Sequence, residues 1–122
     1  MQVRTFKFRS NKERTYIGLT DVMDFFEPSI LGGKSKLQRA KQLATIQYGD
    51  CAAIVDDIDS SKCIFRSRSK FTVTKFLDDN DVQTGDLLRI EKVAPFTYRI
   101  TAVKKESGSD RSSGIGITEG IQ

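Results

Sequence analysis

The sequence predicts a small, mainly β domain: an antiparallel barrel or sandwich with two short helical turns. Segments that alternate apolar and polar residues recur about every ten residues, and turn-forming residues separate them. With 122 residues, of which 38% are hydrophobic, the chain has enough apolar material for one core. A single domain built from short strands is the simplest architecture that fits these observations.

The first half is expected to contain four of the strands. Strands are predicted over residues 3–8, 16–19, 43–48 and 51–55. Between them, Thr20 and Asp21 offer an N-cap for a short helix over 22–27, which Pro28 ends. Residues 29–36, which include Gly32 and Gly33, are expected to form a loop, whereas 37–42 is ambiguous between a helical turn and a strand.

The second half is organised around residues 62–75, KCIFRSRSKFTVTK. A polar turn over 56–61 precedes them, and they resemble a hairpin with strands at 63–65 and 71–74 and a basic tip at 66–70. The segment contains five cations and no acid; an ordinary solvated turn is the alternative interpretation of the tip. A helical turn over 75–79 and a closing hairpin of strands 87–93 and 96–103 follow.

The charge pattern favours a nucleic-acid partner over acidic substrates or membrane surfaces. The formal net charge is +4, and the cations cluster at residues 4–14, 34–41 and 62–75. Acids gather elsewhere, at residues 21–27, 56–59 and 78–81. This segregation predicts one basic face and one acidic face.

Several kinds of catalytic chemistry are missing from the sequence. It contains no histidine, no phosphate-binding glycine loop and only two cysteines, Cys51 and Cys63, which we expect to be free thiols in a reducing compartment. Asp56, Asp57 and Asp59 could hold a hard cation, but a solvated acidic turn is the favoured interpretation. We therefore expect no catalysis, no metal and no cofactor in this chain.

The composition changes near the C-terminus. Residues 106–122 are rich in serine and glycine and are expected to form a flexible tail or linker after a domain that spans 1–105. No apolar run is long enough to cross a membrane, and the N-terminus lacks a signal peptide, so a cytoplasmic location is expected.

Residues 65–93 resemble the second half of the plant-type B-three DNA-binding pseudobarrel: strand, basic loop, strand, helical turn, and then VQTGDLL at 82–88. Residues 16–19, YIGL, followed by DVMDFFEPSI resemble the strand-then-helix unit of the prokaryotic branch, the N-terminal effector domain of EcoRII-type restriction endonucleases. The resemblance covers roughly residues 3–104. It implies a seven-stranded open β-barrel with two short helices.

The same resemblance implies two arms that enter the major groove of DNA. The first arm corresponds to residues 9–15, after the first strand, and the second to 66–70, in the hairpin before the helical turn. The second arm is shorter here, and Lys75-Phe76 replaces the plant family's Gly-Trp pair, so no base preference carries over.

The predicted DNA-contacting residues fall into two groups, the residues of the two arms and a set of phosphate contacts. Among the arm residues, those expected to read base edges are Arg9, Asn11, Arg66 and Arg68. The arm residues are Arg9, Ser10, Asn11, Lys12, Arg14, Arg66, Ser67, Arg68, Ser69 and Lys70, and the phosphate contacts are Lys34, Lys36, Arg39 and Lys75. Tyr16, Phe71 and Phe76 are expected in the core rather than stacked on bases.

The expected function is sequence-specific binding of double-stranded DNA by a monomeric, non-enzymatic domain. The resemblance further implies a bacterial effector or targeting domain whose nuclease domain lies beyond Gln122. Three alternatives remain: a free-standing DNA-binding protein, a β-barrel that binds single-stranded nucleic acid, and a protein-interaction barrel whose basic face meets an acidic partner.

Overall fold

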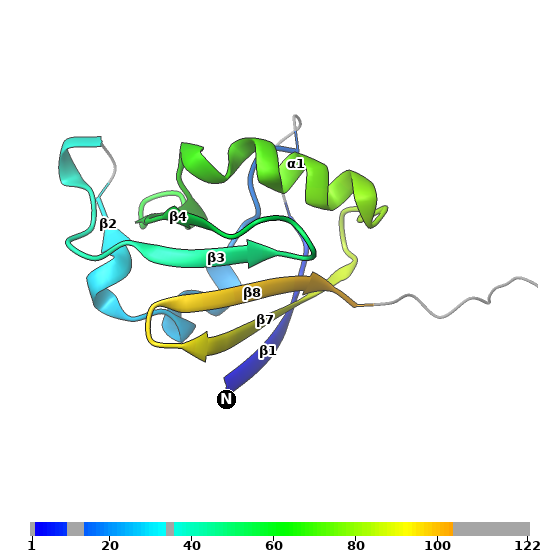
Figure 1. The fold of residues 1–122 in the computed structure, drawn as a ribbon, viewed down its shortest axis with the longest axis horizontal. Helices are drawn as coiled ribbons and strands as arrows, with labels where there is room; N and C mark the ends of the chain where they lie inside the picture. Colours follow the sequence, from blue (N-terminus) through cyan, green and yellow to red (C-terminus); the bar gives the residue numbers. More distant parts are fainter. Residues whose placement is uncertain (1, 10–13, 34–35, 104–122) are drawn as a thin grey trace, which may run out of the picture.

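The computed structural model describes residues 2–9, 14–33 and 36–103. These residues form a mainly β fold with two sheets, as the sequence predicts (Figure 1). The strands are β1 (Gln2–Lys7), β2 (Leu31–Gly32), β3 (Ala44–Tyr48), β4 (Ile54–Asp56), β5 (Ile58–Asp59), β6 (Ile64–Phe65), β7 (Leu87–Ala94) and β8 (Thr97–Ala102). The helices are α1 (Lys70–Asp79) and the 3-10 helices η1 (Thr20–Phe25), η2 (Pro28–Ile30), η3 (Lys36–Gln38) and η4 (Ser67–Ser69).

The larger sheet has five strands in the order β1-β7-β8-β3-β4. All its neighbouring pairs are antiparallel except β3–β8, which is parallel. The hairpin of β7 and β8 confirms the closing hairpin that the sequence predicts, and β1 confirms the first strand. Alternating stretches within these strands, such as Leu88-Arg89-Ile90 in β7 and Tyr98-Arg99-Ile100 in β8, make them recognisable from local pattern.

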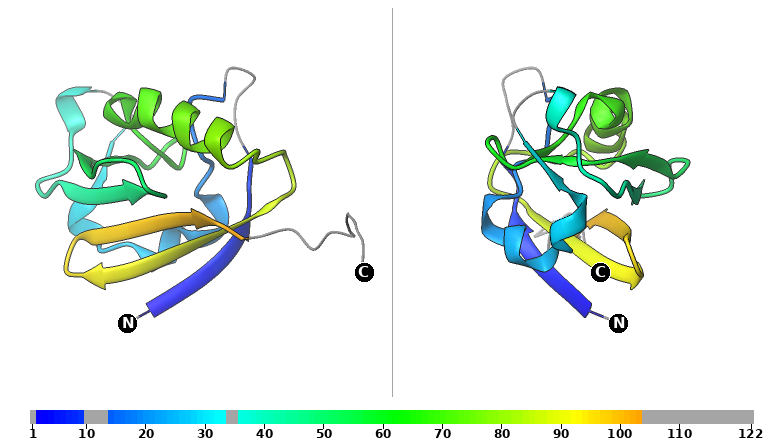
Figure 2. Two further views of the ribbon diagram at one scale, coloured as in Figure 1. Left: turned by 45° about the vertical axis from the view of Figure 1, so that its right-hand side comes forward. Right: turned by 90° about the vertical axis from the view of Figure 1, so that its left-hand side faces the viewer.

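The smaller sheet has three strands in the order β2-β5-β6. Its strands are only two residues long, and β2–β5 is parallel while β5–β6 is antiparallel. The fold thus has eight strands in the described ranges rather than seven, and the two sheets do not form a closed barrel there. Figure 2 shows α1 alongside β3 from two further directions.

The core lies where the larger sheet, η1 and α1 meet. In β3 every second side chain is buried, ending at Tyr48, whose ring is 6.1 Å from that of Phe76 in α1. Phe26, just after η1, packs edge to face on Tyr98 of β8 with ring centroids 5.0 Å apart. One continuous aromatic cluster therefore ties the helices to the sheet.

Of the basic hairpin predicted over residues 62–75, β6 confirms the first strand, but the rest is wrong. Residues 71–74, expected as a strand, form the start of α1, and the expected tip contains η4. The run Thr72-Val73-Thr74 is β-branched and favours a strand locally, but Val73, Phe76 and Leu77 are buried at helical spacing. Packing of this face overrides the local preference.

Other elements differ from prediction more modestly. Residues 16–19 form no strand, and the helix expected over 22–27 is a 3-10 helix over Thr20–Phe25. Residues 56–61, expected as a polar turn, contain β5, and β2 lies in the expected loop. The ambiguous span 37–42 begins within η3, while the predicted tail over 106–122 lies outside the described residues.

Candidate nucleic-acid interface

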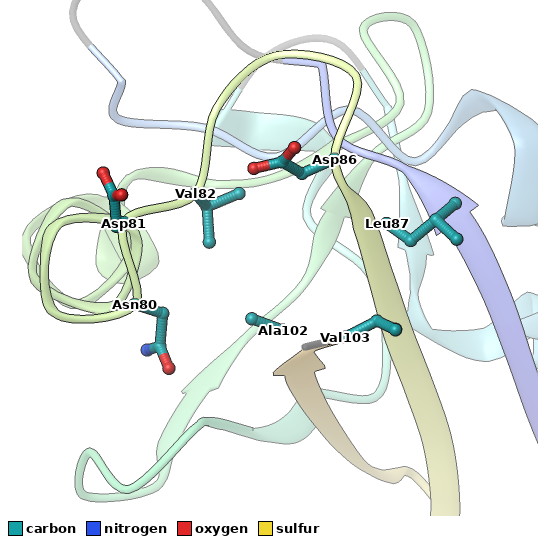
Figure 3. Close-up of a pocket in the computed structure, with 7 residues that line it drawn as sticks. All are labelled: Asn80, Asp81, Val82, Asp86, Leu87, Ala102 and Val103. Carbon is teal, nitrogen blue, oxygen red and sulfur yellow. The ribbon is translucent and has the colours of Figure 1, made fainter. Parts of the chain in front are cut away.

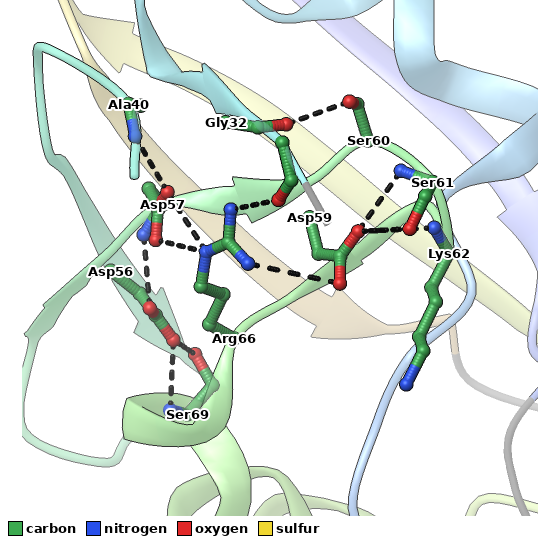
Figure 4. A network of polar contacts seen from close by, with 11 residues as sticks. Gly32, Ala40, Asp56, Asp57, Asp59, Ser60, Ser61, Lys62, Arg66 and Ser69 are labelled. Carbon is green, nitrogen blue, oxygen red and sulfur yellow. Dashed lines mark hydrogen bonds and ion pairs between the residues drawn. The ribbon is translucent and has the colours of Figure 1, made fainter. Parts of the chain in front are cut away.

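Three aspartates near the smaller sheet are buried, and each accepts a backbone N–H from a different segment (Figure 4). Asp56 Oδ2 accepts the Ser69 N–H at 3.0 Å and the Ser69 hydroxyl at 2.9 Å. Asp57 Oδ2 accepts the Ala40 N–H at 2.9 Å, and Asp59 Oδ1 accepts the Lys62 N–H at 3.3 Å. The predicted solvated acidic turn is therefore wrong, because these carboxylates fasten three segments together.

Arg66 supplies the positive charge for this network. Its Nε lies 2.9 and 3.0 Å from the two carboxylate oxygens of Asp57, and its Nη1 lies 3.7 Å from Asp59 Oδ2. Its Nη2 donates to the carbonyl of Gly33, and the side chain is only 9% exposed. A guanidinium bound in this way does not reach a base edge, so the predicted base-reading role of Arg66 is corrected to a structural one.

The network leaves no room for a side chain at position 32. A Cβ on Gly32 would lie 2.5 Å from both Arg66 Nη2 and Asp57 Oδ2, and 2.8 Å from the Ala40 nitrogen. The Gly32 carbonyl also accepts the Ser60 N–H at 3.1 Å and the Ser60 hydroxyl at 2.7 Å. Glycine in β2 thus allows the polar groups to approach the backbone closely.

Burial and hydrogen bonding shift two of these carboxyl groups in opposite directions. Burial raises the pKa of Asp56 and outweighs the hydrogen bonds that it accepts from Ser69 and from the Asp57 amide. Burial also acts to raise the pKa of Asp59, but the Ser61 hydroxyl, the amides of Ser61 and Lys62 and the charge of Arg66 together lower it. The ionised form of Asp59 is thus favoured by the fold.

The fastened segments present exposed cations. Arg39 and Lys41 flank Ala40, Arg68 and Lys70 flank Ser69, and Lys62 itself donates to Asp59. Within the part of the chain that the structure describes, none of these five cations lies in an ion pair. We call Arg39, Lys41, Lys62, Arg68 and Lys70 the unpaired set.

Cations elsewhere on the fold mostly lie beside acids. Most of these pairs are on or next to the larger sheet. Lys75, a predicted phosphate contact, instead forms an ion pair with Asp79 within α1 at 2.8 Å. The paired set is Arg4–Asp24 at 2.6 Å, Lys92–Glu27 at 3.0 Å, Arg89–Glu91 at 3.7 Å, Arg99–Asp50 at 3.9 Å and Lys75–Asp79. Their charges are largely neutralised locally.

The first predicted arm is closed at its base. The Arg9 carbonyl accepts the Gly18 N–H at 2.7 Å, and the Arg9 side chain is exposed. Arg14 instead is half-buried, donates to the Val82 carbonyl at 2.8 Å and lies 3.7 Å from Asp78. Ser10, Asn11 and Lys12 lie outside the described residues.

The end of this loop adjoins the only hairpin turn of the smaller sheet in the described residues. The Leu19 N–H donates at 2.7 Å to the carbonyl of Cys63, which ends the turn between β5 and β6. That turn, residues 60–63, carries Lys62. The hairpin tip predicted at 66–70 begins six residues after this turn, which carries a single cation and is therefore less conspicuous in the sequence than the basic run.

The remaining predicted site residues divide by exposure. Arg68, Lys70 and Arg39 are exposed, whereas Ser69 is buried against Asp56. Ser67 and Lys36 begin η4 and η3, and Lys34 lies outside the described ranges. Lys41, Lys62 and the three aspartates were missed as site residues, and the Asp-Asp-x-Asp spacing was the signal that could have found the aspartates.

A pocket of about 360 Å³ lies at the opposite end of α1 from these cations (Figure 3). It is lined by Asn80, Asp81, Val82, Asp86, Leu87, Ala102 and Val103. Carboxylates of Asp81 and Asp86 at this pocket disfavour a polyanion, so it does not compete with the unpaired set as a nucleic-acid site.

Two further searches of the described part of the chain, for metal-binding groups and for membrane-spanning helices, find none. No group of three or more His, Cys, Asp or Glu side chains there is arranged to hold a metal ion. None of the helices there is long and apolar enough to cross a membrane.

Comparison of the chain with family models, curated proteins and solved structures finds no significant match. Function must therefore be inferred from the side chains themselves.

Proposed function

We propose that this chain binds double-stranded DNA in a sequence-specific manner, without catalysis or a cofactor. The observation that carries the proposal is the unpaired set: five exposed cations on three segments that Asp56, Asp57 and Asp59 hold by their backbones. Unpaired cations on a surface repel one another and gain little from solvent alone, so a polyanion is the partner that their arrangement favours.

Fixed backbones make such cations effective. Because the segments are held before binding, the chain loses less conformational freedom when their side chains meet phosphates. Each neutralised phosphate releases counterions, so five contacts would give a dependence of log K on log salt of about −4.5. The cations of the paired set contribute little to this slope, because acids already neutralise them.

The proposal assigns each of the two arms to a loop. The first remains the loop that Arg9 opens, and the second moves from residues 66–70 to the turn at 60–63, which is the hairpin before α1. Arg9 and Lys62 then extend from neighbouring loops. Arg39, Lys41, Arg68 and Lys70 bind phosphates beside them and fix the register on the duplex.

The finer architecture is part of the same proposal. The resemblance to B-three-like domains implies a seven-stranded open pseudobarrel. The eight observed strands are compatible with this seven-stranded architecture under two conditions. β4 and β5, separated only by Asp57, count as one interrupted strand, and residues 16–19 occupy the position of a strand. In this proposal β2 is an additional short strand. The resemblance also extends the proposal to a bacterial, cytoplasmic, monomeric targeting domain of a restriction endonuclease, with the nuclease domain outside this chain.

A second candidate, binding of single-stranded nucleic acid, is favoured by one observation. Such binding needs exposed aromatic rings, and Phe71 is 85% exposed rather than buried in the core as expected. The ring follows Lys70 directly in the first turn of α1. Duplex binding remains the first proposal because the unpaired cations on several separate segments suit a wide, regular backbone.

Selection of bound duplexes from a randomised pool at physiological salt tests the proposal. The expected result is a short enriched motif whose binding weakens as salt rises. Tighter binding to single strands of the same sequences would favour the second candidate. Binding to neither form, or binding that does not respond to salt, would contradict the proposal.

A further inference from the structure

The two most exposed large apolar side chains of the described residues both lie on the basic segments. Leu37 is 98% exposed and Phe71 is 85% exposed. The other exposed large hydrophobic residues, spread over β1, β4, β7 and the end of β8, reach only 37–47%. Single half-exposed hydrophobics are ordinary, but a nearly bare Phe and Leu at one end of a fold are not explained by packing.

Phe71 plays no part in holding α1 in place. The helix packs through Val73, Phe76 and Leu77, and the Phe71 ring makes no aromatic contact within the described ranges. Its neighbours in this turn and η4 are Lys70 and Arg68, both of the unpaired set. The ring therefore protrudes from a cationic surface without a structural role in the free protein.

Leu37 stands in a similar setting. It lies in η3, two residues before Arg39, which is exposed and belongs to the unpaired set. Figure 2 shows η3, in cyan, and the start of α1, in green, at the same end of the molecule. Both segments are fixed by adjacent aspartates, since Ala40 donates to Asp57 and Ser69 to Asp56.

We propose that Phe71 stacks on a base that becomes unstacked in the bound DNA, and that Leu37 makes a second apolar contact at the same site. This inference rests on the proposed DNA binding. A ligand that satisfies both features must combine dense negative charge with apolar planar groups, and DNA with an opened base step does so. An acidic protein would satisfy the cations but gives no reason for a ring set among them.

The test compares two duplexes of one sequence, one fully paired and one with a single unpaired base, replaced by 2-aminopurine for fluorescence. Dissociation constants at fixed salt are measured for the wild type, Phe71→Ala, Phe71→Trp and Leu37→Ala. Val93→Ala is the matched control, because Val93 is an exposed apolar residue but lies in β7 of the larger sheet rather than on a segment that carries the unpaired set. Circular dichroism checks that each variant is folded.

The expected result is tighter binding of the wild type to the duplex with the unpaired base. Phe71→Ala should bind that duplex about 5- to 100-fold more weakly than the wild type does. It should also lose the change in 2-aminopurine fluorescence that stacking produces in the wild-type complex. Phe71→Trp should retain both, Leu37→Ala should lose less, and Val93→Ala should match the wild type.

Two results separate the inference from the proposed function. If Phe71→Ala binds both duplexes as the wild type does, stacking is overturned while DNA binding stands. If the wild type binds neither duplex in a salt-dependent way, or binds an acidic polypeptide more tightly, both proposals are overturned.

Discussion

The two sheets of this fold manage their charges in opposite ways. On the larger sheet, cations such as Arg89 and Arg99, whose side chains are 47% and 42% exposed, lie beside the acids Glu91 and Asp50. Around the smaller sheet, Asp56, Asp57 and Asp59 are buried and the neighbouring cations of the unpaired set face outward without acids. Around the smaller sheet, then, the acids are buried and the cations are exposed. The sequence predicted a basic face and an acidic face, but it did not predict this separation by burial.

This difference has an energetic consequence. Exposed ion pairs contribute little to stability and are screened by salt, so the larger sheet depends on its apolar core. A buried carboxylate that loses its partner is costly, so the smaller sheet depends on its polar network. The short strands β2, β5 and β6 could not hold three segments by sheet hydrogen bonds alone.

The largest expected effect comes from removing Asp57. Asp57→Ala leaves Arg66 buried with only the more distant Asp59 nearby and frees the Ala40 N–H. The free energy of unfolding, measured by urea denaturation, should fall by about 3–5 kcal/mol. Asp50→Ala removes the fully exposed acid of the 3.9 Å pair with Arg99; it is the control and should unfold like the wild type. Equal effects of the two variants would contradict the contrast between the sheets.

Gly32→Ala should have the next largest effect. Its Cβ would push Arg66 and Asp57 apart, and such overpacking typically costs about 1–3 kcal/mol of unfolding free energy. Gly18→Ala is a milder comparison, since its Cβ would meet the Arg9 carbonyl at 3.2 Å. If Gly32→Ala were as stable as Gly18→Ala, the network would be looser than the structure indicates.

The opposite pKa shifts of Asp56 and Asp59 predict opposite pH dependences. A raised pKa means that wild-type stability relative to Asp56→Asn should fall as pH rises above the ordinary aspartate value of 3.8. A lowered pKa means that wild-type stability relative to Asp59→Asn should be present above 3.8 and be lost as pH falls below it. Unfolding free energies from pH 2 to about 7 check both signs, and a shared sign would contradict the assignment.

The smallest expected effect belongs to a single surface cation. Lys62→Ala should leave stability unchanged and reduce the slope of log K against log salt for duplex DNA by about 1. Lys75→Ala, at a cation paired with Asp79, should leave that slope unchanged. A larger change for Lys75→Ala than for Lys62→Ala would reverse the assignment of the unpaired and paired sets.

Sequence reasoning succeeded where structure follows from neighbouring residues. In β8 buried apolar residues alternate with polar ones, and in β7 and β1 Leu88, Ile90 and Phe6 are buried between more exposed neighbours, so a period of two identifies these strands. It failed at α1, where Thr72, Val73 and Thr74 favour a strand locally but the buried face has helical period. The deciding contacts, such as Phe76 with Tyr48, involve residues distant in the sequence.

The candidate site was only partly predictable for a similar reason. The basic clusters were visible in the sequence, and Arg68, Lys70 and Arg39 are exposed as a DNA contact requires. Arg66 has the same residue type as Arg68 but is buried, because Asp57 lies opposite it in the folded chain. No local pattern tells these two arginines apart.

A pair of charge-matched variants tests the central contrast most directly. Arg39, Lys41, Arg68 and Lys70 are changed to glutamine in one variant, and Arg4, Lys75, Arg89 and Arg99 in the other. Both lose the same net charge, and duplex binding is measured over a range of salt. We predict that the first variant loses most of its affinity and that its slope of log K against log salt becomes smaller in magnitude by about 3.6. The second variant should bind nearly as the wild type does. Equal losses in both would show that net charge alone, not the unpaired set, governs binding.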